Sequence, residues 1–244
     1  MQPAIPLWIT LPIVATTIGV PIVAWLAFRK VARRSARALI APTFIFVALW
    51  LIVAFTLSAR GFFVNAGASI PPIAWALLPL VVGYLGYLTL RSARTAVDAI
   101  PLQWLIGLEF YRALGVVFLV VWMLGGLPAA FALPTGIGDL AIGLTAPFVA
   151  ARVRDGAPRA RETAILWNVL GIADLVVAVT LGTLTTPGPL HVAALGAPSV
   201  GIISMPLVLI TSIAVPFSLL IHLIGLHRLT GRAQPATLGL SKAA

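Results

Sequence analysis

Long apolar runs dominate the sequence, and polar residues do not alternate with apolar ones along them. A helix needs roughly 20 residues to cross the bilayer core, and a chain in lipid can satisfy its backbone hydrogen bonds only as a helix or a closed barrel. Because the runs are long and unalternating, we predict an all-α integral membrane bundle of seven transmembrane helices. The predicted spans are Ile5–Phe28, Ala38–Ser58, Ile73–Leu90, Leu102–Leu124, Thr135–Val153, Thr163–Leu184 and Leu207–His227.

The composition agrees with this prediction. Hydrophobic residues make up 61% of the 244 positions and charged residues 9%, with a mean hydropathy of +1.10. Cysteine is absent, which excludes disulfides, thiolate catalysis and cysteine-ligated metal centres. No connection is long enough to divide the chain, so we predict a single transmembrane domain over residues 1–244.

The basic residues indicate the orientation. The net charge is +10, but the lysines and arginines fall in short clusters between the apolar runs. Such clusters mark cytoplasmic connections, so we predict no nucleic-acid partner. With the N-terminus outside and the C-terminus inside, all but two of the 16 basic residues lie inside; the exceptions are Arg60 and Arg112. We expect a multi-pass protein of the cell inner membrane whose first run is an uncleaved span.

Three of the six acidic residues lie within predicted spans: Glu109, Asp139 and Asp174. A charge near the bilayer centre costs about 2.5 to 3.5 kcal/mol, so it normally faces the bundle interior and has a partner. The basic residue at that depth is Arg112. At 1.5 Å per residue, Arg112 and Asp174 are each about 15 to 16 Å from the inner ends of their spans. We therefore predict that Arg112 pairs with Asp174, with Glu109 as its second partner.

Asp139 and Asp174 stand in similar stretches, GIGDLAIGLT and GIADLVVAVT. Small residues flank each aspartate on the same helical face, which lets another helix approach closely. Asn168 adds an amide to the same region. Asp139 lies about 6 Å below the outer end of its predicted span, and we interpret it as an outer, more hydrated position.

Two outer connections are unusually apolar. The segment Gly125–Gly136 has no charged residue, and its prolines predict a break instead of a continuous helix. The segment Pro187–Pro206 carries only His191 as a titratable group. Surfaces of this kind lie on lipid, cover one end of a bundle or bind a partner.

The histidines do not predict a cofactor. His222 and His227 share one helix at an offset of about 140°, whereas bis-histidine haem ligands come from facing helices. We therefore expect no cofactor and no metal. His222 is either a packed core residue or a member of a proton relay.

Seven spans with the N-terminus outside resemble the topology of microbial rhodopsins and of SWEET-type transporters. Retinal needs a lysine in the last span, and the two lysines, Lys30 and Lys242, lie outside the predicted spans. The residues Tyr111–Ala150, followed by WNVLGIADLVVA from Trp167, resemble a set of uncharacterised bacterial multipass membrane proteins. This resemblance groups Arg112, Asp139, Asn168 and Asp174 but implies no established activity.

Two functions remain open from the sequence. The first is a proton- or cation-coupled secondary transporter or channel that moves a small solute or ion through the Arg112, Asp174 and Asp139 cluster. The alternative is a non-catalytic subunit or assembly factor of a larger membrane complex, with a protein partner or a second copy docked on the apolar outer segments. An intramembrane enzyme is the least favoured class, because the sequence offers few nucleophiles and bases.

Overall fold

The computed structural model describes residues 5–31, 34–64, 67, 71–192 and 199–231. Helix is the only regular structure within these ranges. Within these ranges, seven helical segments are long and apolar enough to cross a membrane, which is the predicted number. Their elements are α1 (Leu7–Val31), η1 and α2 (Arg34–Leu39, Ile40–Ala59), η3 and α3 (Pro72–Leu77, Leu78–Thr89), α5, η4 and α6 (Leu102–Leu108, Glu109–Gly115, Val116–Met123), α7 (Ala129–Arg154), α8 (Ala160–Thr185), and η7 and α9 (Ile210–Ala214, Val215–Thr230).

Shorter elements connect the spans. The connections contain the 3-10 turns η2 (Phe62–Val64) and η6 (Val200–Ile203), and the helix α4 (Arg91–Asp98) between the third and fourth spans. Asp98 accepts a hydrogen bond from the Tyr87 hydroxyl and lies 3.7 Å from Arg228 Nε, so it joins α4 to α3 and α9.

The predicted break before the fifth span is shorter than expected: α6 ends at Met123, and α7 already begins at Ala129. Pro128 caps α7, and its carbonyl accepts hydrogen bonds from the backbone N–H groups of Phe131 and Ala132. Pro134 lies in the second turn of the helix. It removes one backbone donor there, and the helix continues through it. α7 therefore begins six residues earlier than the predicted span, and Asp139 lies about 15 Å from its start.

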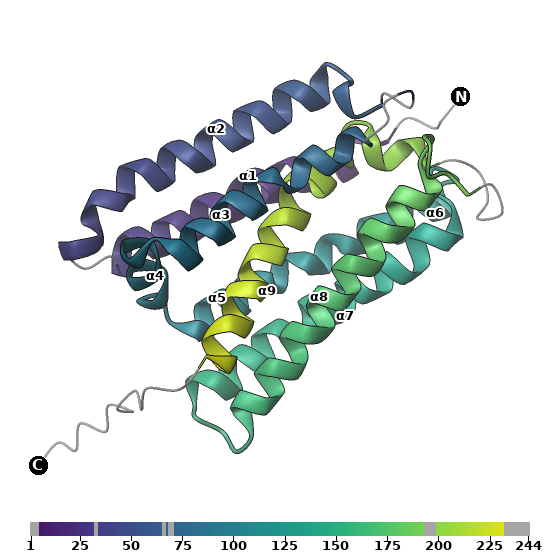
Figure 1. Cartoon of the computed structure of the whole chain (residues 1–244). Coiled ribbons are helices and arrows are strands. Elements are labelled where there is room, and N and C mark those ends of the chain that lie inside the picture. Colours follow the sequence, from purple (N-terminus) through teal and green to yellow (C-terminus); the bar gives the residue numbers. More distant parts are fainter. Residues whose placement is uncertain (1–4, 32–33, 65–66, 68–70, 193–198, 232–244) are drawn as a thin grey trace, which may run out of the picture.

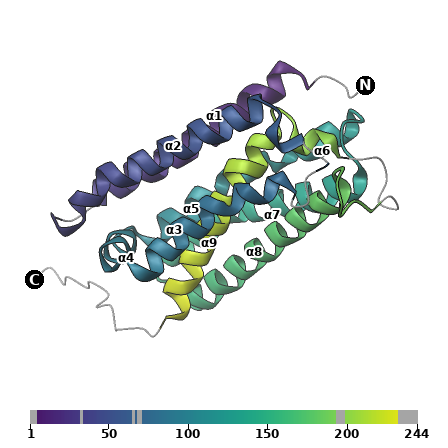
Figure 2. The ribbon, with the colours of Figure 1, turned by 45° about the horizontal axis from the view of Figure 1, so that its top comes forward.

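α9 lies in the middle of the bundle, with α3 on one side and α8 on the other (Figure 1). α7 packs against α8 and against all three parts of the fourth span. α1 and α2 contact each other at the edge of the bundle (Figure 2). The start of α1 and the end of α9 lie at opposite ends of the bundle, as an odd number of crossings requires.

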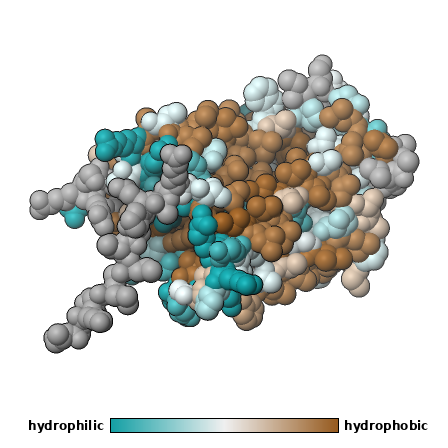
Figure 3. Space-filling model, turned by 60° about the horizontal axis from the view of Figure 1, so that its bottom comes forward, coloured by the Kyte–Doolittle hydropathy of each residue, from teal (hydrophilic) through white to brown (hydrophobic). Residues whose placement is uncertain are grey.

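The surface fits a multipass membrane protein. A broad hydrophobic belt covers the face in Figure 3, and hydrophilic residues gather toward one end. α2 is exposed along most of its length, and its large exposed side chains are apolar: Phe44, Ile45, Phe46, Leu49, Ile52 and Val53. We call the end of the bundle that carries Arg29, Arg91 and Arg154 the basic end, and the opposite end the N-terminal end.

Candidate functional site

A buried charge cluster lies where the fourth span crosses α7, α8 and α9. Its centre is Arg112, which is 4% exposed and lies on η4. Residues three apart eclipse each other in a 3-10 helix, so Glu109 lies on the same side of η4 and is also buried. The other members predicted from the sequence are Asp139 on α7 and Asn168 and Asp174 on α8. His222 on α9, for which the sequence left packing and a proton relay open, also lies in the cluster.

Glycines allow η4 to lie directly against α7. A Cβ added at Gly143 would stand 2.2 Å from the backbone nitrogen of Ala113, and one at Gly115 would stand 2.2 Å from the Cβ of Asp139. A Cβ at Gly136 would be 2.7 Å from a side chain of α6. Only glycine fits such contacts, so the predicted close approach beside Asp139 is confirmed.

Substitution of Gly143 by alanine tests this packing. We expect Gly143→Ala to lower the free energy of unfolding by about 1–3 kcal/mol, because the new methyl group forces the backbones of α7 and η4 apart. Gly19→Ala is the matched control, since a Cβ at Gly19 on α1 meets nothing within 4 Å. Denaturant unfolding in detergent measures both, and equal stabilities would contradict this account of the contact.

α8 meets its neighbours in the same way. A Cβ at Gly138 of α7 would stand 1.7 Å from Asp174 Oδ1, and one at Gly171 of α8 would stand 2.4 Å from the His222 ring. The carboxylate of Asp174 and the imidazole of His222 therefore occupy space that two glycines leave free. Close approach at glycine is what brings the polar groups of four spans together.

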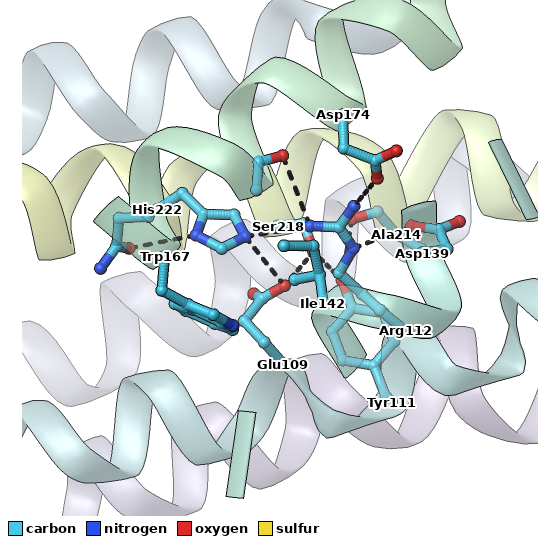
Figure 4. Close-up of polar contacts among 12 residues, drawn as sticks. Glu109, Tyr111, Arg112, Asp139, Ile142, Trp167, Asp174, Ala214, Ser218 and His222 are labelled. Carbon is cyan, nitrogen blue, oxygen red and sulfur yellow. Dashed lines mark hydrogen bonds and ion pairs between the residues drawn. The ribbon is translucent and has the colours of Figure 1, made fainter. Parts of the chain in front are cut away.

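Arg112 joins three helices through its guanidinium group, which lies between the two aspartates (Figure 4). Nε donates to Asp139 Oδ1 at 2.8 Å, and Nη2 donates to Asp174 Oδ2. Nη1 donates to the carbonyl oxygen of Gly171 at 3.5 Å and to His222 Nε2 at 3.0 Å. All three nitrogens of the guanidinium are thus bound inside the bundle.

The predicted ion pair between Arg112 and Asp174 is present, but the second partner is Asp139 and not Glu109. The early start of α7 places Asp139 as deep as Asp174, whereas the sequence-based boundary placed it near the end of the span. Asp139 is therefore not the outer position that we predicted, and the two aspartate side chains are almost equally exposed, at 13% and 12%. His222 Nε2 contacts both Arg112 Nη1, at 3.0 Å, and Glu109 Oε2, at 3.5 Å (Figure 4).

The hydrogen bonds of Asn168 determine which nitrogen of His222 carries a proton. Asn168 Nδ2 donates to the carbonyl oxygen of Ala164 at 2.8 Å, so its Oδ1 faces His222 and accepts from Nδ1–H at 3.1 Å. Arginine can only donate, so His222 Nε2 accepts from Arg112. The nitrogen of this imidazole that lacks a proton is therefore Nε2, because Nδ1–H is held by the amide.

Glu109 is fully buried and has two different carboxyl oxygens. Oε2 lies 3.5 Å from His222 Nε2, and Oε1 is buried without a hydrogen-bond partner. A deprotonated Nε2 accepts a hydrogen bond from Arg112 and has no proton to donate to Glu109. A protonated Nε2 can instead donate a hydrogen bond to Glu109 Oε2. One proton can therefore reside on either Glu109 or His222.

Two residues that the sequence reasoning missed extend this contact. Ser218 Oγ donates to Glu109 Oε2 at 2.6 Å. The Tyr111 hydroxyl lies 2.7 Å from Ser218 Oγ and 3.0 Å from the Ala214 carbonyl oxygen, and it can donate its single proton to either of them. The sequence did contain a signal for Ser218, because this residue stands four positions before His222 and therefore lies on the same helical face. Tyr111 stands beside Arg112 but had no comparable signal.

Two cavities adjoin the cluster on the side of Asp139. A small one of about 30 Å³ is lined by the polar residues Tyr111, Arg112, Asp139 and Ser218 together with apolar ones. It has the volume and the polar lining that hold a water molecule. A larger one of about 230 Å³ extends from Asp139 between α7 and α8 to Pro71 and Leu190 at the N-terminal end.

The remaining carboxylates lie apart from this cluster. Asp155 is exposed after the end of α7, and the hydrogen bonds from Arg154 hold the pKa of the Asp155 carboxyl below its ordinary value. Glu162 is exposed in the first turn of α8. Within the described ranges, no group of three His, Asp or Glu side chains has the spacing of a metal site.

The comparisons with known proteins give a family. The family model described as "Domain of unknown function (DUF8737)" matches residues 68–230, which include the whole charge cluster and both adjoining cavities except Thr16 and Thr17. No curated protein and no solved structure matches the chain. Because the match covers more than half of the sequence, the chain belongs to the family of the domain of unknown function DUF8737.

Proposed function

We propose that this protein is a secondary transporter of the cell inner membrane. It exchanges a small cation that has an apolar body for protons at the Arg112 cluster. The observation that carries the proposal is the position of Asp139. Its carboxylate binds Arg112, and the same residue lines the 230 Å³ cavity. A group with both roles can respond to a solute on one side and to a buried charge on the other.

The charges of the cluster favour uptake of positive charge. Three carboxylates surround one guanidinium, so with His222 neutral and every other group ionised the cluster has an excess of two negative charges. Uncompensated charge removed from water is strongly unfavourable. Binding of a proton or of a cationic solute reduces this excess.

The cavity indicates the class of solute. Its walls are aliphatic and aromatic except for the Asp139 carboxylate and the hydroxyl-bearing residues Thr135, Thr183, Thr186 and Thr211. Apolar walls with one carboxylate fit a solute with a compact apolar body and a positive charge. The predicted topology places the N-terminal end of this cavity outside.

The exchange follows from competition for Asp139. A cationic solute that reaches Asp139 competes with Arg112 Nε, while Arg112 keeps its bonds to Asp174, Gly171 and His222. A proton on Asp139 removes the charge that holds the solute and so releases it. Each ligand stabilises a different arrangement of the same cluster, which is the requirement for coupling.

A chain of hydrogen bonds can carry the proton between residues of the cluster. Tyr111, Ser218, Glu109 and His222 follow one another, with Oγ–Oε2 and hydroxyl–Oγ distances of 2.6 and 2.7 Å. The 30 Å³ cavity lies between this chain and Asp139. Water in that cavity would link the two proton-binding carboxylates.

The test uses protein in liposomes that contain a pH-sensitive dye, with a gradient of benzyltrimethylammonium as the probe cation. We expect the gradient to drive proton movement in the opposite direction with the wild-type protein. Asp139→Asn and Asp174→Asn should reduce this movement to the level of protein-free liposomes, because an amide cannot exchange a proton. Asp155→Asn is the matched control, since Asp155 is exposed and away from the cluster.

Three results would overturn the proposal. Unchanged proton movement in both cluster variants would show that the aspartates only hold helices together. Proton entry driven by voltage without the probe cation would indicate a channel. Absence of any movement, together with a membrane protein that co-purifies in fixed stoichiometry, would favour a non-catalytic subunit of a larger complex.

A further inference from the structure

A second large cavity lies outside the charge cluster, between α2 and the helices α3 and α9. Its volume is about 370 Å³, and its walls are almost entirely apolar. α2 contacts α1 and the ends of its neighbours, but it is separated from α3 along the middle of the bundle (Figures 1 and 2). Phe46 and Trp50 of α2 face Leu80 of α3 and Phe217 of α9 across this space.

The basic end of this cavity is rich in positive charge. At this end, three residues that line the cavity each stand within two positions of an exposed arginine in the sequence: Phe28, Leu39 and Leu90. These arginines are Arg29, Arg37 and Arg91, on α1, η1 and α4. η1 and α4 contact each other, so the three segments meet at one end of the cavity.

Among the described residues, no carboxylate forms an ion pair with these three arginines. Arg37 and Arg91 have no ion pair within the described parts of the chain. Asp98, the acidic residue of α4, is already bound to Tyr87 and close to Arg228. An anion at this place would therefore find free guanidinium groups.

We propose that this cavity binds an anionic phospholipid, with one acyl chain between α2 and α3 and its phosphate beside Arg37 and Arg91. The apolar walls match a hydrocarbon chain, and the arginines at one end match a headgroup with a net negative charge. A zwitterionic headgroup carries a cation of its own, which the same cluster repels. The site is independent of the proposed transport function, because it shares no residue with the Arg112 cluster.

Gly86 provides a direct test of the acyl-chain part. It lines the cavity, and a Cβ at this position would meet nothing within 4 Å. Gly86→Leu therefore fills the cavity with a side chain while leaving the helix contacts in place. Gly19→Leu is the matched control, because Gly19 also lies on a span, faces open space and does not line the cavity.

Arg37→Gln with Arg91→Gln tests the headgroup part, with Arg159→Gln as control. Arg159 is exposed at the same end, in the connection between α7 and α8. The two tested arginines are also exposed, so this double variant keeps the proposal testable if Gly86→Leu fails to fold.

Native mass spectrometry of the purified full-length chain, with phosphatidylglycerol or phosphatidylcholine added at equal concentration, measures the binding. We expect preferential retention of phosphatidylglycerol by the wild type and both controls. The double arginine variant should lose roughly tenfold or more in affinity for phosphatidylglycerol, and Gly86→Leu should lose retention of both lipids. Equal retention of the two lipids by the wild type, or unchanged retention of phosphatidylglycerol in the folded variants, would overturn the proposal.

Discussion

Arg112→Gln is expected to lower the free energy of unfolding by about 3–5 kcal/mol, the largest stability change of any single substitution in the cluster. The substitution removes the guanidinium that binds Asp139, Asp174 and His222 and leaves two aspartates buried without their partner. Loss of one partner from a buried ion pair is costly because the remaining charge stays away from water. Unfolding in mixed detergent, followed by circular dichroism, measures the change.

A matched variant separates lost charge balance from lost packing. Arg112→Gln combined with Asp139→Asn and Asp174→Asn removes the unpaired charges as well as the guanidinium. We expect this triple variant to recover most of the stability that the single substitution loses. If the triple variant is less stable than Arg112→Gln, the carboxylates are not the source of the loss and the account of the cluster is wrong.

Glu109→Gln is expected to abolish proton-driven transport while leaving exchange of the solute against itself intact. The amide has nearly the volume of the carboxyl group and can still accept the hydrogen bond from Ser218. It cannot take a proton from His222 Nε2, which lies 3.5 Å away. Exchange of labelled against unlabelled benzyltrimethylammonium needs no net proton movement, so comparison of the two assays isolates the proton step.

Glu162→Gln is the control for this experiment, because Glu162 is exposed at the start of α8. Loss of both proton-driven transport and solute exchange in a folded Glu109→Gln protein would assign Glu109 to packing or solute binding. Retention of both would remove Glu109 from the proton path.

The number of spans was predictable from the sequence because hydropathy decides it locally. A run of about 20 apolar residues has few alternatives in lipid, and all seven runs form helices. The start of α7 was not predictable in this way. Pro128 and Pro134 can end a helix or stand in its first turns, and only the packing of Phe131 and Ala132 in the core distinguishes these cases.

The members of the cluster were predictable because a buried charge needs a partner. Arg112 binds Asp139 and Asp174, and His222 connects the predicted members Glu109 and Asn168 to this ion pair. Their pairing was not predictable, because it depends on depth and on the rotation of each helix. A shift of six residues in the start of α7 moved Asp139 to the level of Arg112.

The role of His222 also needed the structure. In the sequence it is an isolated histidine in an apolar span, for which packing and proton relay are both reasonable. Its Nε2 contacts both Arg112 and Glu109 while Nδ1 is held by Asn168, an arrangement that supports the proposed proton relay. The hydrogen-bond partners carry this information, and they come from spans distant in the sequence.

The most direct test of the central claim is proton release from the purified protein in weakly buffered detergent solution when benzyltrimethylammonium is added. If the cation and the proton compete for Asp139, the wild-type protein and Asp155→Asn should release protons on addition of the cation, and Asp139→Asn should release none. An absence of release from the wild type, or equal release from Asp139→Asn, would contradict the exchange of a cation for a proton at this cluster.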